Sequence, residues 1–285
     1  MKGIILAGGK GTRLHPITIS YSKQLLPVYD KPLIYYPLST LINLRIKDIL
    51  IIINRDQLTN FKNLLGDGSN YGINIKYAIQ KKPKGIAEAL IIGKKFIKND
   101  SVALILGDNI FFGSDMYSNI NSIDLNLGAI IFLYQVKNPH QYGVAEFKKN
   151  RITKIVEKPK ITKSRRAVTG LYIYNNDVVN LVTKLKPSSR GELEITDINN
   201  IYLKNNQLNY VNLDNSSAWF DAGTPQSLLS ASQYIQAIQD RNSILVSSPE
   251  EASFRNNFIS KLKLKNILLK KIKNQYYQSL YNLIK

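Results

Sequence analysis

The first half of the chain alternates short, largely apolar runs with longer amphipathic stretches. The apolar runs, which are typical of strands buried on both faces, lie at residues 4–6, 49–53, 73–79, 102–106 and 129–134. Helical spacing is found between them, near 33–45, 57–65, 86–97 and 115–123. Strands that alternate with helices predict an α/β fold with a doubly wound, mostly parallel sheet, in which ligands bind at the carboxyl ends of the strands.

The pattern becomes less regular in the middle of the chain and helical at its end. Strand candidates lie at 143–148, 151–156, 168–174 and 208–213, and helical segments lie near 177–184 and 197–204. We expect this stretch to extend the same sheet and to cover a substrate. From Thr224 onward the apolar positions recur at helical spacing, with further helices after Pro249, over 262–272 and over 276–284. The sequence therefore predicts a core over 1–223 and a C-terminal helical region over 224–285.

The composition excludes several classes of site. The chain has no cysteine and only two histidines, so disulfides, thiolate catalysis and cysteine-ligated metals are ruled out and a multi-histidine zinc site is disfavoured. No apolar run approaches the roughly 18 residues that span a bilayer. The N-terminus turns glycine-rich too early for a signal peptide. We expect a soluble, cytoplasmic protein without a membrane partner.

The charge is strongly positive. The chain has 39 Lys and Arg against 20 Asp and Glu, a formal net charge of +19. Basic proteins often bind nucleic acids or anionic membranes. However, Lys is in excess together with Ile and Asn, which is typical of drift toward A/T-rich codons, and the basic residues of 252–285 have no acidic counterpart. We interpret much of the charge as compositional and expect no specific nucleic-acid partner.

A glycine-rich loop with a cation follows the first apolar run. Residues 6–13 read Leu-Ala-Gly-Gly-Lys-Gly-Thr-Arg. Such a loop can point backbone N–H groups at phosphate oxygens, and the guanidinium of Arg13 suits the same ligand. The loop is not a Walker A sequence, and it does not match the dinucleotide fingerprint because Leu14 takes the place of the third glycine.

Two further clusters supply a cation and carboxylates. Lys23, within residues 22–27, is close enough in sequence to reach the same phosphates. Asp108 follows the apolar run 102–106, at the carboxyl end of a predicted strand. Magnesium is usually held by one or two carboxylates plus phosphate oxygens, and Asp221 is a second candidate. Each aspartate could instead cap a helix or form a turn.

In this order the clusters resemble the sugar-phosphate nucleotidylyltransferases, and among them the branch that transfers a thymidylyl group from dTTP to glucose 1-phosphate. The strings at 35–41 and 190–197 are the most specific to this branch, and the resemblance is close from residue 1 to about 260. The matching segments are 2–16, 22–27, 29–32, 35–41, 64–69, 106–111, 142–144, 157–159, 167–172 and 190–197.

The resemblance implies roles for individual residues. Arg13, Lys23 and Asp108 would be catalytic, and Gln80 would read the thymine edge, since a carboxamide can answer both N3–H and O4. The implied nucleotide-binding residues are Gly8, Gly9, Gly11, Thr12, Arg13, Lys23, Gln24, Gln80, Gly85 and Asp108. The implied sugar-phosphate-binding residues are Asn109, Tyr142, Gly143, Glu157, Lys158 and Val168. Mg²⁺ would be held by Asp108 and Asp221.

The resemblance also implies a pathway and an assembly. The reaction would be the first step of dTDP-sugar synthesis of the rhamnose type. The C-terminal helices would pack between the subunits of a homotetramer and help to form a regulatory site, with a dimer as the alternative. Beyond Ser260 the chain becomes rich in lysine, which departs from the family.

Two alternative functions stay open at this point. A uridylyltransferase acting on the same sugar phosphate would also suit Gln80, because uracil presents the same edge as thymine. A catalytically silent basic binding protein would be expected to have lost its active-site residues. That second alternative is disfavoured because the candidate active-site residues are all present, namely Arg13, Lys23, Asp108, Glu157, Lys158 and Asp221.

Overall fold

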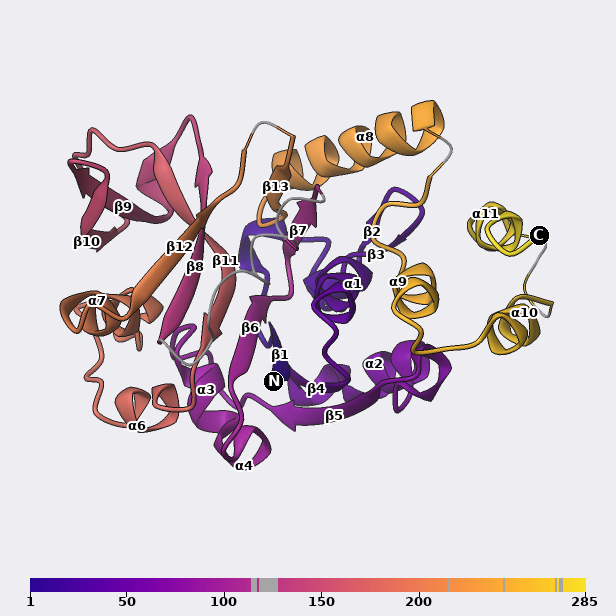
Figure 1. Cartoon of the computed structure of the whole chain (residues 1–285), viewed down its shortest axis with the longest axis horizontal. Helices are drawn as coiled ribbons and strands as arrows, with labels where there is room; N and C mark the ends of the chain where they lie inside the picture. The colour runs from indigo at the N-terminus through magenta and orange to yellow at the C-terminus, as the bar shows by residue number, and fades with distance from the viewer. Residues whose placement is uncertain (114–116, 118–127, 215, 243, 270, 272–273) are drawn as a thin grey trace.

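The central feature of the computed structural model is a sheet of nine strands within the described residues, 1–113, 117, 128–214, 216–242, 244–269, 271 and 274–285 (Figure 1). One half of the sheet is parallel, in the order β6-β1-β4-β5. Its strands are β1 (Lys2–Ala7), β4 (Asp48–Ile53), β5 (Asn74–Ile79) and β6 (Val102–Leu106). These strands coincide with apolar runs of the sequence, which confirms the predicted α/β class.

The other half of the sheet is built around β11 (Arg166–Tyr174), which runs antiparallel to β6, β8 and β9. The register between β11 and β8 shifts between Val168 and Tyr172, so β11 separates from β8 at Thr169 and Gly170. The remaining strands are β8 (Ala129–Gln135), β9 (Gly143–Lys148), β10 (Arg151–Glu157) and β12 (Leu208–Asn212). The irregular middle of the chain thus extends the same sheet, as predicted.

Two small ribbons were not predicted. β7 (Asn109–Phe112) pairs antiparallel with β13 (Ala218–Asp221), and the register places Asp221 opposite Asn109. β2 (Pro27–Val28) pairs with β3 (Lys31–Pro32). Both ribbons are too short to show a periodic pattern, yet the first one brings together residues far apart in sequence.

Helices cover both faces of the sheet. The helices that precede residue 205 are α1 (Tyr35–Asn43), α2 (Leu58–Leu65), α3 (Glu88–Ile92), α4 (Lys94–Ile97), α6 (Val178–Val182) and α7 (Ile195–Lys204). The single helix predicted over 86–97 is divided at Gly93, where a methyl group would lie 2.6 Å from Ile4 Cδ1. The helix predicted over 115–123 lies outside the described residues, apart from Tyr117.

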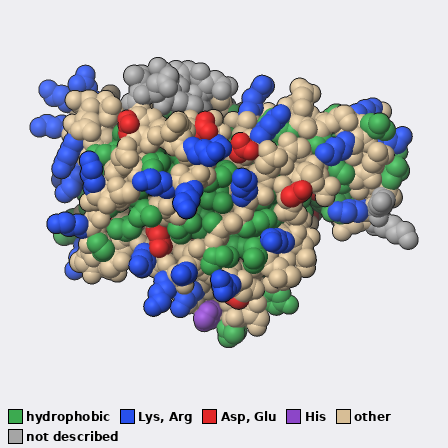
Figure 2. Space-filling view, turned by 90° about the horizontal axis from the view of Figure 1, so that it is seen from below, with side chains coloured by type: hydrophobic (Ala, Val, Ile, Leu, Met, Phe, Trp, Pro, Cys, Tyr) green, Lys and Arg blue, Asp and Glu red, His purple; other side chains and the backbone are tan. Residues whose placement is uncertain are grey.

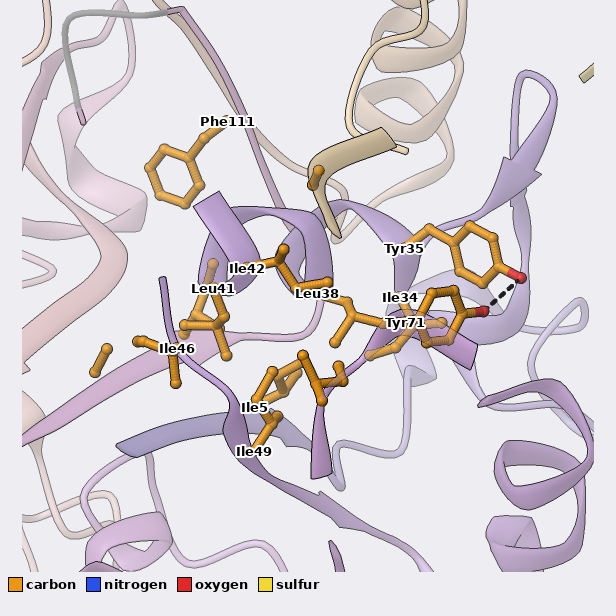
Figure 3. Packing of buried hydrophobic residues seen from close by; sticks show 14 of the residues in the cluster. Ile5, Ile34, Tyr35, Leu38, Leu41, Ile42, Ile46, Ile49, Tyr71 and Phe111 are labelled. Atoms are coloured by element: carbon orange, nitrogen blue, oxygen red, sulfur yellow. Dashed lines mark hydrogen bonds between the residues drawn. The ribbon is translucent and has the colours of Figure 1, made fainter. Parts of the chain in front are cut away.

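An apolar layer of buried side chains lies on each face of the sheet. Ile5 and Ile49 pack with α1 on one face (Figure 3), whereas their neighbours Ile4 and Leu50 belong to the layer on the other face. Successive side chains of a strand point to opposite faces, so a continuous apolar run is buried on both. Each fully buried isoleucine contributes about 1.5–3 kcal/mol, and Ile4, Ile5 and Ile49 are all 0% exposed.

The last part of the chain is helical, as predicted. It comprises α8 (Pro225–Asn242), α9 (Pro249–Arg255), α10 (Lys261–Leu269) and α11 (Gln275–Asn282). In Figure 1, α9 lies beside α1, and α10 and α11 lie at the end of the molecule farthest from β10. Among the described residues, no helix combines the length and the apolar character needed to cross a membrane.

Basic side chains lie over much of the surface. Figure 2 shows blue side chains scattered on one face and gathered at its left end, where β9 and β10 lie in Figure 1. Lys148, Lys149, Arg151 and Lys154 of this hairpin are exposed. These cations lie apart from the carboxyl ends of the parallel strands.

A buried carboxylate in α9 connects this helix to α11 through a hydrogen bond. Glu250, only 3% exposed, accepts hydrogen bonds from the hydroxyl groups of Tyr276 (2.7 Å) and Ser248 (3.2 Å). Burial raises the pKa of Glu250, and these two donors partly oppose that effect. Tyr276 also packs its ring under the ammonium of Lys31, 5.5 Å from the ring centroid.

We predict that Tyr276→Phe, which keeps the ring and removes the hydroxyl, lowers the free energy of unfolding by about 1–3 kcal/mol at neutral pH. The loss should shrink as the pH falls through the raised pKa of Glu250, because a protonated carboxyl needs less solvation. Urea unfolding at several pH values measures both effects. Tyr277→Phe, on the half-buried neighbouring ring, is the control, and an equal loss in both variants would contradict the assignment.

Candidate active site

Two cavities lie near the carboxyl ends of β1, β5 and β6. The loop cavity, of about 730 Å³, is lined by the glycine-rich loop, the segment after β4 and the end of β5, including Gly9, Thr12 and Gln80. The aspartate cavity, of about 440 Å³, is lined by Asp108, Asp221 and residues from β7, β9, β10, β11 and β13. This position agrees with the expectation for a doubly wound sheet.

The glycine-rich loop passes close to Gln80. A methyl group at Gly8 would lie 2.2 Å from Gln80 Oε1, so only glycine fits beside this side chain. Gly11 has a left-handed φ of 64°, and its carbonyl oxygen accepts a hydrogen bond from Thr18 Oγ1 at 2.7 Å. Leu14 is fully buried and anchors the end of the loop. The loop is thus held against β5 with Thr12 exposed.

Lys23 and Asp108 form a buried ion pair at the end of β6. The ammonium of Lys23, 8% exposed, contacts Asp108 Oδ2, and Asn109 Nδ2 donates to Asp108 Oδ1 at 3.1 Å. Burial alone would raise the pKa of Asp108, but the Lys23 charge and the hydrogen bonds outweigh it, and the net shift is downward. Asp108 is therefore ionised at neutral pH.

Asp221 is brought beside Asp108 by the β7–β13 ribbon. Burial and the negative charge of Asp108 raise the pKa of Asp221 to about 6, against the opposing effect of Lys23, Arg13 and Lys158. The Arg13 guanidinium lies close by, since a methyl group at Gly223 would be 2.7 Å from Arg13 Nη2 and 2.9 Å from Asp221 Oδ1. Two carboxylates surrounded by cations are a combination that could hold a divalent metal together with phosphate oxygens.

Glu157, at the end of β10, also lines the aspartate cavity. Its Oε2 accepts from Thr196 Oγ1 at 2.6 Å, and its Oε1 accepts from Arg190 Nη2 at 3.2 Å. A methyl group at Gly143 would be 3.3 Å from Glu157 Oε2, so glycine there leaves the carboxylate uncovered. Lys158 follows with a left-handed φ of 43° and its side chain half exposed. The wall thus combines an acceptor and a cation.

Trp219 and Asn109 connect the two sides of the cavity. The indole Nε1 of Trp219 donates to Asn109 Oδ1 at 2.6 Å, and the same oxygen accepts from the backbone N–H of Gly170 at 3.0 Å. The separation of β11 from β8 leaves Gly170 free to make this bond. The ring of Trp219 meets Tyr142 edge to face, with centroids 5.1 Å apart. Asn109 therefore fixes Asp108, β11 and Trp219 together.

The structure brings most of the residues singled out in the sequence into these two cavities. Gly9, Thr12 and Gln80 line the loop cavity, and Gly8 and Gly11 belong to the same loop. The residues that line the aspartate cavity are Arg13, Asp108, Asn109, Tyr142, Gly143, Glu157, Lys158, Val168 and Asp221. Lys23 reaches the second cavity through its ion pair with Asp108.

Gln24 and Gly85 lie differently from this group. Gln24 is buried, with an exposed fraction of 3%, and its amide oxygen Oε1 accepts a hydrogen bond from Ser22 Oγ at 2.6 Å. Gly85, with a left-handed φ of 100°, packs against the backbone of Leu193, where a methyl group would be 2.4 Å from the carbonyl oxygen. Neither residue lines the two cavities.

Sequence reasoning missed Trp219, Thr196 and Arg190 as site residues. Thr196 and Arg190 lie within the string 190–197, on which the resemblance rests, and Trp219 lies two residues before Asp221. The string was useful as a signature of the family, but nothing in it shows that Thr196 and Arg190 face Glu157.

Among the described residues, no group of three or more Asp, Glu or His is arranged to hold a metal. A metal held by the two aspartates would therefore take its other ligands from substrate or water.

The profile of the nucleotidyl transferase family matches residues 2–238. The chain belongs to this family. The match confirms the resemblance seen in the sequence, and members of the family are generally metal-dependent.

Curated relatives resemble the chain along its whole length. Glucose-1-phosphate thymidylyltransferase of Neisseria meningitidis serogroup A / serotype 4A is 50% identical over 287 residues and covers 100% of both chains. The enzyme of the same name from Mycolicibacterium smegmatis is 48% identical and covers 100% of this chain and 99% of its own.

Solved structures resemble the chain in fold. A putative glucose-1-phosphate thymidylyltransferase from Bacillus anthracis, in complex with a sucrose, has a TM-score of 0.77 and 44% identity, over 82% of this chain and 94% of its own. A UDP-glucose pyrophosphorylase complexed with UDP-glucose has a TM-score of 0.69 and 25% identity, over 83% of this chain and 98% of its own.

We predict that Asn109→Ala destabilises the protein, because it leaves two buried N–H groups, of Trp219 and Gly170, without their acceptor. Unsatisfied buried donors cost about 1–3 kcal/mol each, so the free energy of unfolding should fall by about 2 kcal/mol or more. Denaturant unfolding measures the loss. Asn212→Ala, on an exposed position of β12, is the control, and a loss below about 0.5 kcal/mol in Asn109→Ala would disprove the linking role.

Proposed function

We propose that the protein is a glucose-1-phosphate thymidylyltransferase, which transfers a thymidylyl group from dTTP to glucose 1-phosphate and releases pyrophosphate. The observation that carries this proposal is the 50% identity, over the whole length of both chains, to a relative with that name. Its support within the structure is the pair of aspartates with surrounding cations in the aspartate cavity, which suits a sugar phosphate. The loop cavity, lined by the glycine-rich loop and Gln80, suits a nucleotide.

The reaction needs no covalent protein intermediate. An oxygen of the sugar phosphate forms a bond to the α-phosphorus of dTTP, and the bond from that phosphorus to the bridging oxygen of pyrophosphate breaks. The attacking group is already an anion, so no general base is needed. The obstacle is repulsion between two polyanions, and catalysis is therefore mainly positioning and charge neutralisation.

In this proposal the cations of the chain neutralise the phosphates. Arg13 contacts the departing β- and γ-phosphates, Lys23 contacts oxygens around the reacting centre, and Lys158 contacts the sugar phosphate. Asp108 and Asp221 would hold Mg²⁺, which supplies further positive charge where negative charge gathers. The donor set fits this ion, since hard carboxylate oxygens are what Mg²⁺ prefers.

The aspartate cavity would hold glucose 1-phosphate. Glu157 accepts hydrogen bonds from sugar hydroxyls, and Thr196 and Arg190 orient its carboxylate. The remaining proposed sugar-phosphate contacts are Asn109, Tyr142, Gly143, Lys158 and Val168, which all line this cavity.

The loop cavity would hold the nucleotide. Gln80 reads the thymine edge from its buried position at the end of β5, and the glycine-rich loop carries the phosphates. The further residues proposed for this side are Gly8, Gly9, Gly11, Thr12, Gln24 and Gly85. Gln24 and Gly85 would act on the nucleotide by supporting the loop and the segment that follows Gln80.

The setting of the enzyme is also a proposal. The reaction is the first step of dTDP-sugar synthesis of the rhamnose type, in the cytoplasm. The helical region over 224–285 supplies the contacts of a homotetramer and of a regulatory site, while residues 1–223 form the catalytic core with its sugar-phosphate-binding region.

A second candidate is transfer of a uridylyl group from UTP. It is favoured by the similarity to a UDP-glucose pyrophosphorylase and by Gln80, which suits uracil as well as thymine.

We expect pyrophosphate release from purified protein with dTTP, glucose 1-phosphate and Mg²⁺, and faster release with dTTP than with UTP. A coupled pyrophosphate assay measures both rates, with reactions lacking the sugar phosphate as the control. Faster release with UTP would favour the second candidate. Absence of release with either nucleotide, from protein shown to be folded, would refute the proposal.

We also expect Asp108→Asn and Lys23→Ala each to lower kcat by at least about 100-fold, the scale for loss of one preorganised electrostatic contact. Lys163→Ala, which removes an exposed cation outside the aspartate cavity, should leave kcat unchanged. Near-normal turnover in either active-site variant would remove that residue from the mechanism.

A further inference from the structure

Glu88, the first residue of α3, holds two groups of the segment that leads from β5 to that helix. Its Oε2 accepts a hydrogen bond from Gln80 Nε2 at 2.7 Å and another from the backbone N–H of Lys84 at 2.9 Å. Gln80 is 3% exposed and lines the loop cavity, so its buried amide nitrogen is paired with Glu88 next to that cavity.

The chemistry of a carboxylate determines which way the Gln80 amide faces. An ionised glutamate can only accept hydrogen bonds, so the amide nitrogen of Gln80 must face Glu88 and the amide oxygen must turn away. The oxygen turns toward the glycine-rich loop, where a methyl group at Gly8 would lie 2.2 Å from it. Within the described ranges, Gln80 Oε1 takes part in no hydrogen bond and is available as an acceptor.

This orientation suits one class of pyrimidine and opposes the other. Gln80 Oε1 can accept from an N3–H group, and the second hydrogen of Nε2 can be donated to a carbonyl oxygen at C4. Thymine and uracil present this pair of groups, whereas cytosine presents an acceptor at N3 and an amino group at C4. A flipped amide would suit cytosine instead.

We propose that Glu88 is a specificity-determining positioning residue, which fixes the Gln80 amide so that the site accepts thymine or uracil and rejects cytosine. The inference rests on the proposed function, in which Gln80 reads the base. A glutamine at position 88 can donate as well as accept, so it would allow the Gln80 amide to adopt either orientation. A site with fixed polar groups rejects a mismatched ligand because those groups stay unpaired.

The test compares dTTP, dUTP and dCTP, which share deoxyribose and triphosphate and differ only in the base. We expect Glu88→Gln to lower the ratio of kcat/KM for dTTP to kcat/KM for dCTP by at least about tenfold, the effect of one well-oriented hydrogen bond to a base edge. The ratio for dTTP to dUTP should stay unchanged, because both bases present the same edge. Glu88→Ala, which removes both bonds, should lower the dTTP to dCTP ratio as well.

Two controls separate positioning from a general structural effect. Asp177→Asn makes the same charge change at an exposed carboxylate that accepts from Asn175 Nδ2, and it should leave all ratios unchanged. In a Gln80→Ala background, Glu88→Gln should have no further effect on the dTTP to dCTP ratio, because the amide that it orients is absent. Thermal melting of each variant shows that it is folded.

The outcomes distinguish the inference from the proposed function. An unchanged dTTP to dCTP ratio in Glu88→Gln, or an equal fall for all three nucleotides, would overturn the role of Glu88 while leaving the thymidylyltransferase proposal intact. Absence of turnover in the unaltered protein would refute that proposal. In that case, calorimetry without the sugar phosphate still gives the dissociation constants of dTTP and dCTP. If the ratio of these two constants is the same in the unaltered protein and in Glu88→Gln, the inference is overturned.

Discussion

The site depends on keeping two carboxylates close together in a partly dehydrated pocket. Asp108 and Asp221 repel one another, and burial adds to the cost of ionising both. Three features of the chain offset this cost: the Lys23 ammonium against Asp108, the Asn109 amide beside it, and the guanidinium of Arg13 near Asp221. The same cations lie where phosphate groups would bind. The groups that offset the repulsion between the two carboxylates are thus the groups proposed to stabilise the reaction.

The sheet provides the rigid frame for this arrangement. Asp108 follows the end of β6, which lies between β1 and β11 and is buried on both faces. Asp221 reaches it only because β13 pairs with β7, directly after the same strand. The parallel half of the sheet therefore positions the glycine-rich loop and Gln80, and the antiparallel half positions Glu157. The reacting groups would meet at the junction between the two halves.

Much of the architecture was predictable from sequence, because buried strands and amphipathic helices have strong periodic patterns. The parallel strands and the C-terminal helices agree with the expectation. The glycine-rich loop, Lys23 and Asp108 were recognisable because their residue types suit phosphate chemistry. In contrast, β7 and β13 are too short to have a pattern, so the pairing of Asp221 with Asn109 was not predictable. The contacts of Thr196, Arg190 and Glu88 depend on which side chains face each other after folding, and a linear sequence does not contain that information directly.

Trp219 has a consequence for how the protein can be studied. It is the single tryptophan of the chain, and it lies between Asn109 and Tyr142 in the wall of the aspartate cavity. Its ultraviolet emission therefore comes from the site alone, without a background from other indoles. Indole emission depends on the polarity and hydrogen bonding around the ring. The fluorescence of Trp219 therefore reports the binding of a ligand in that cavity.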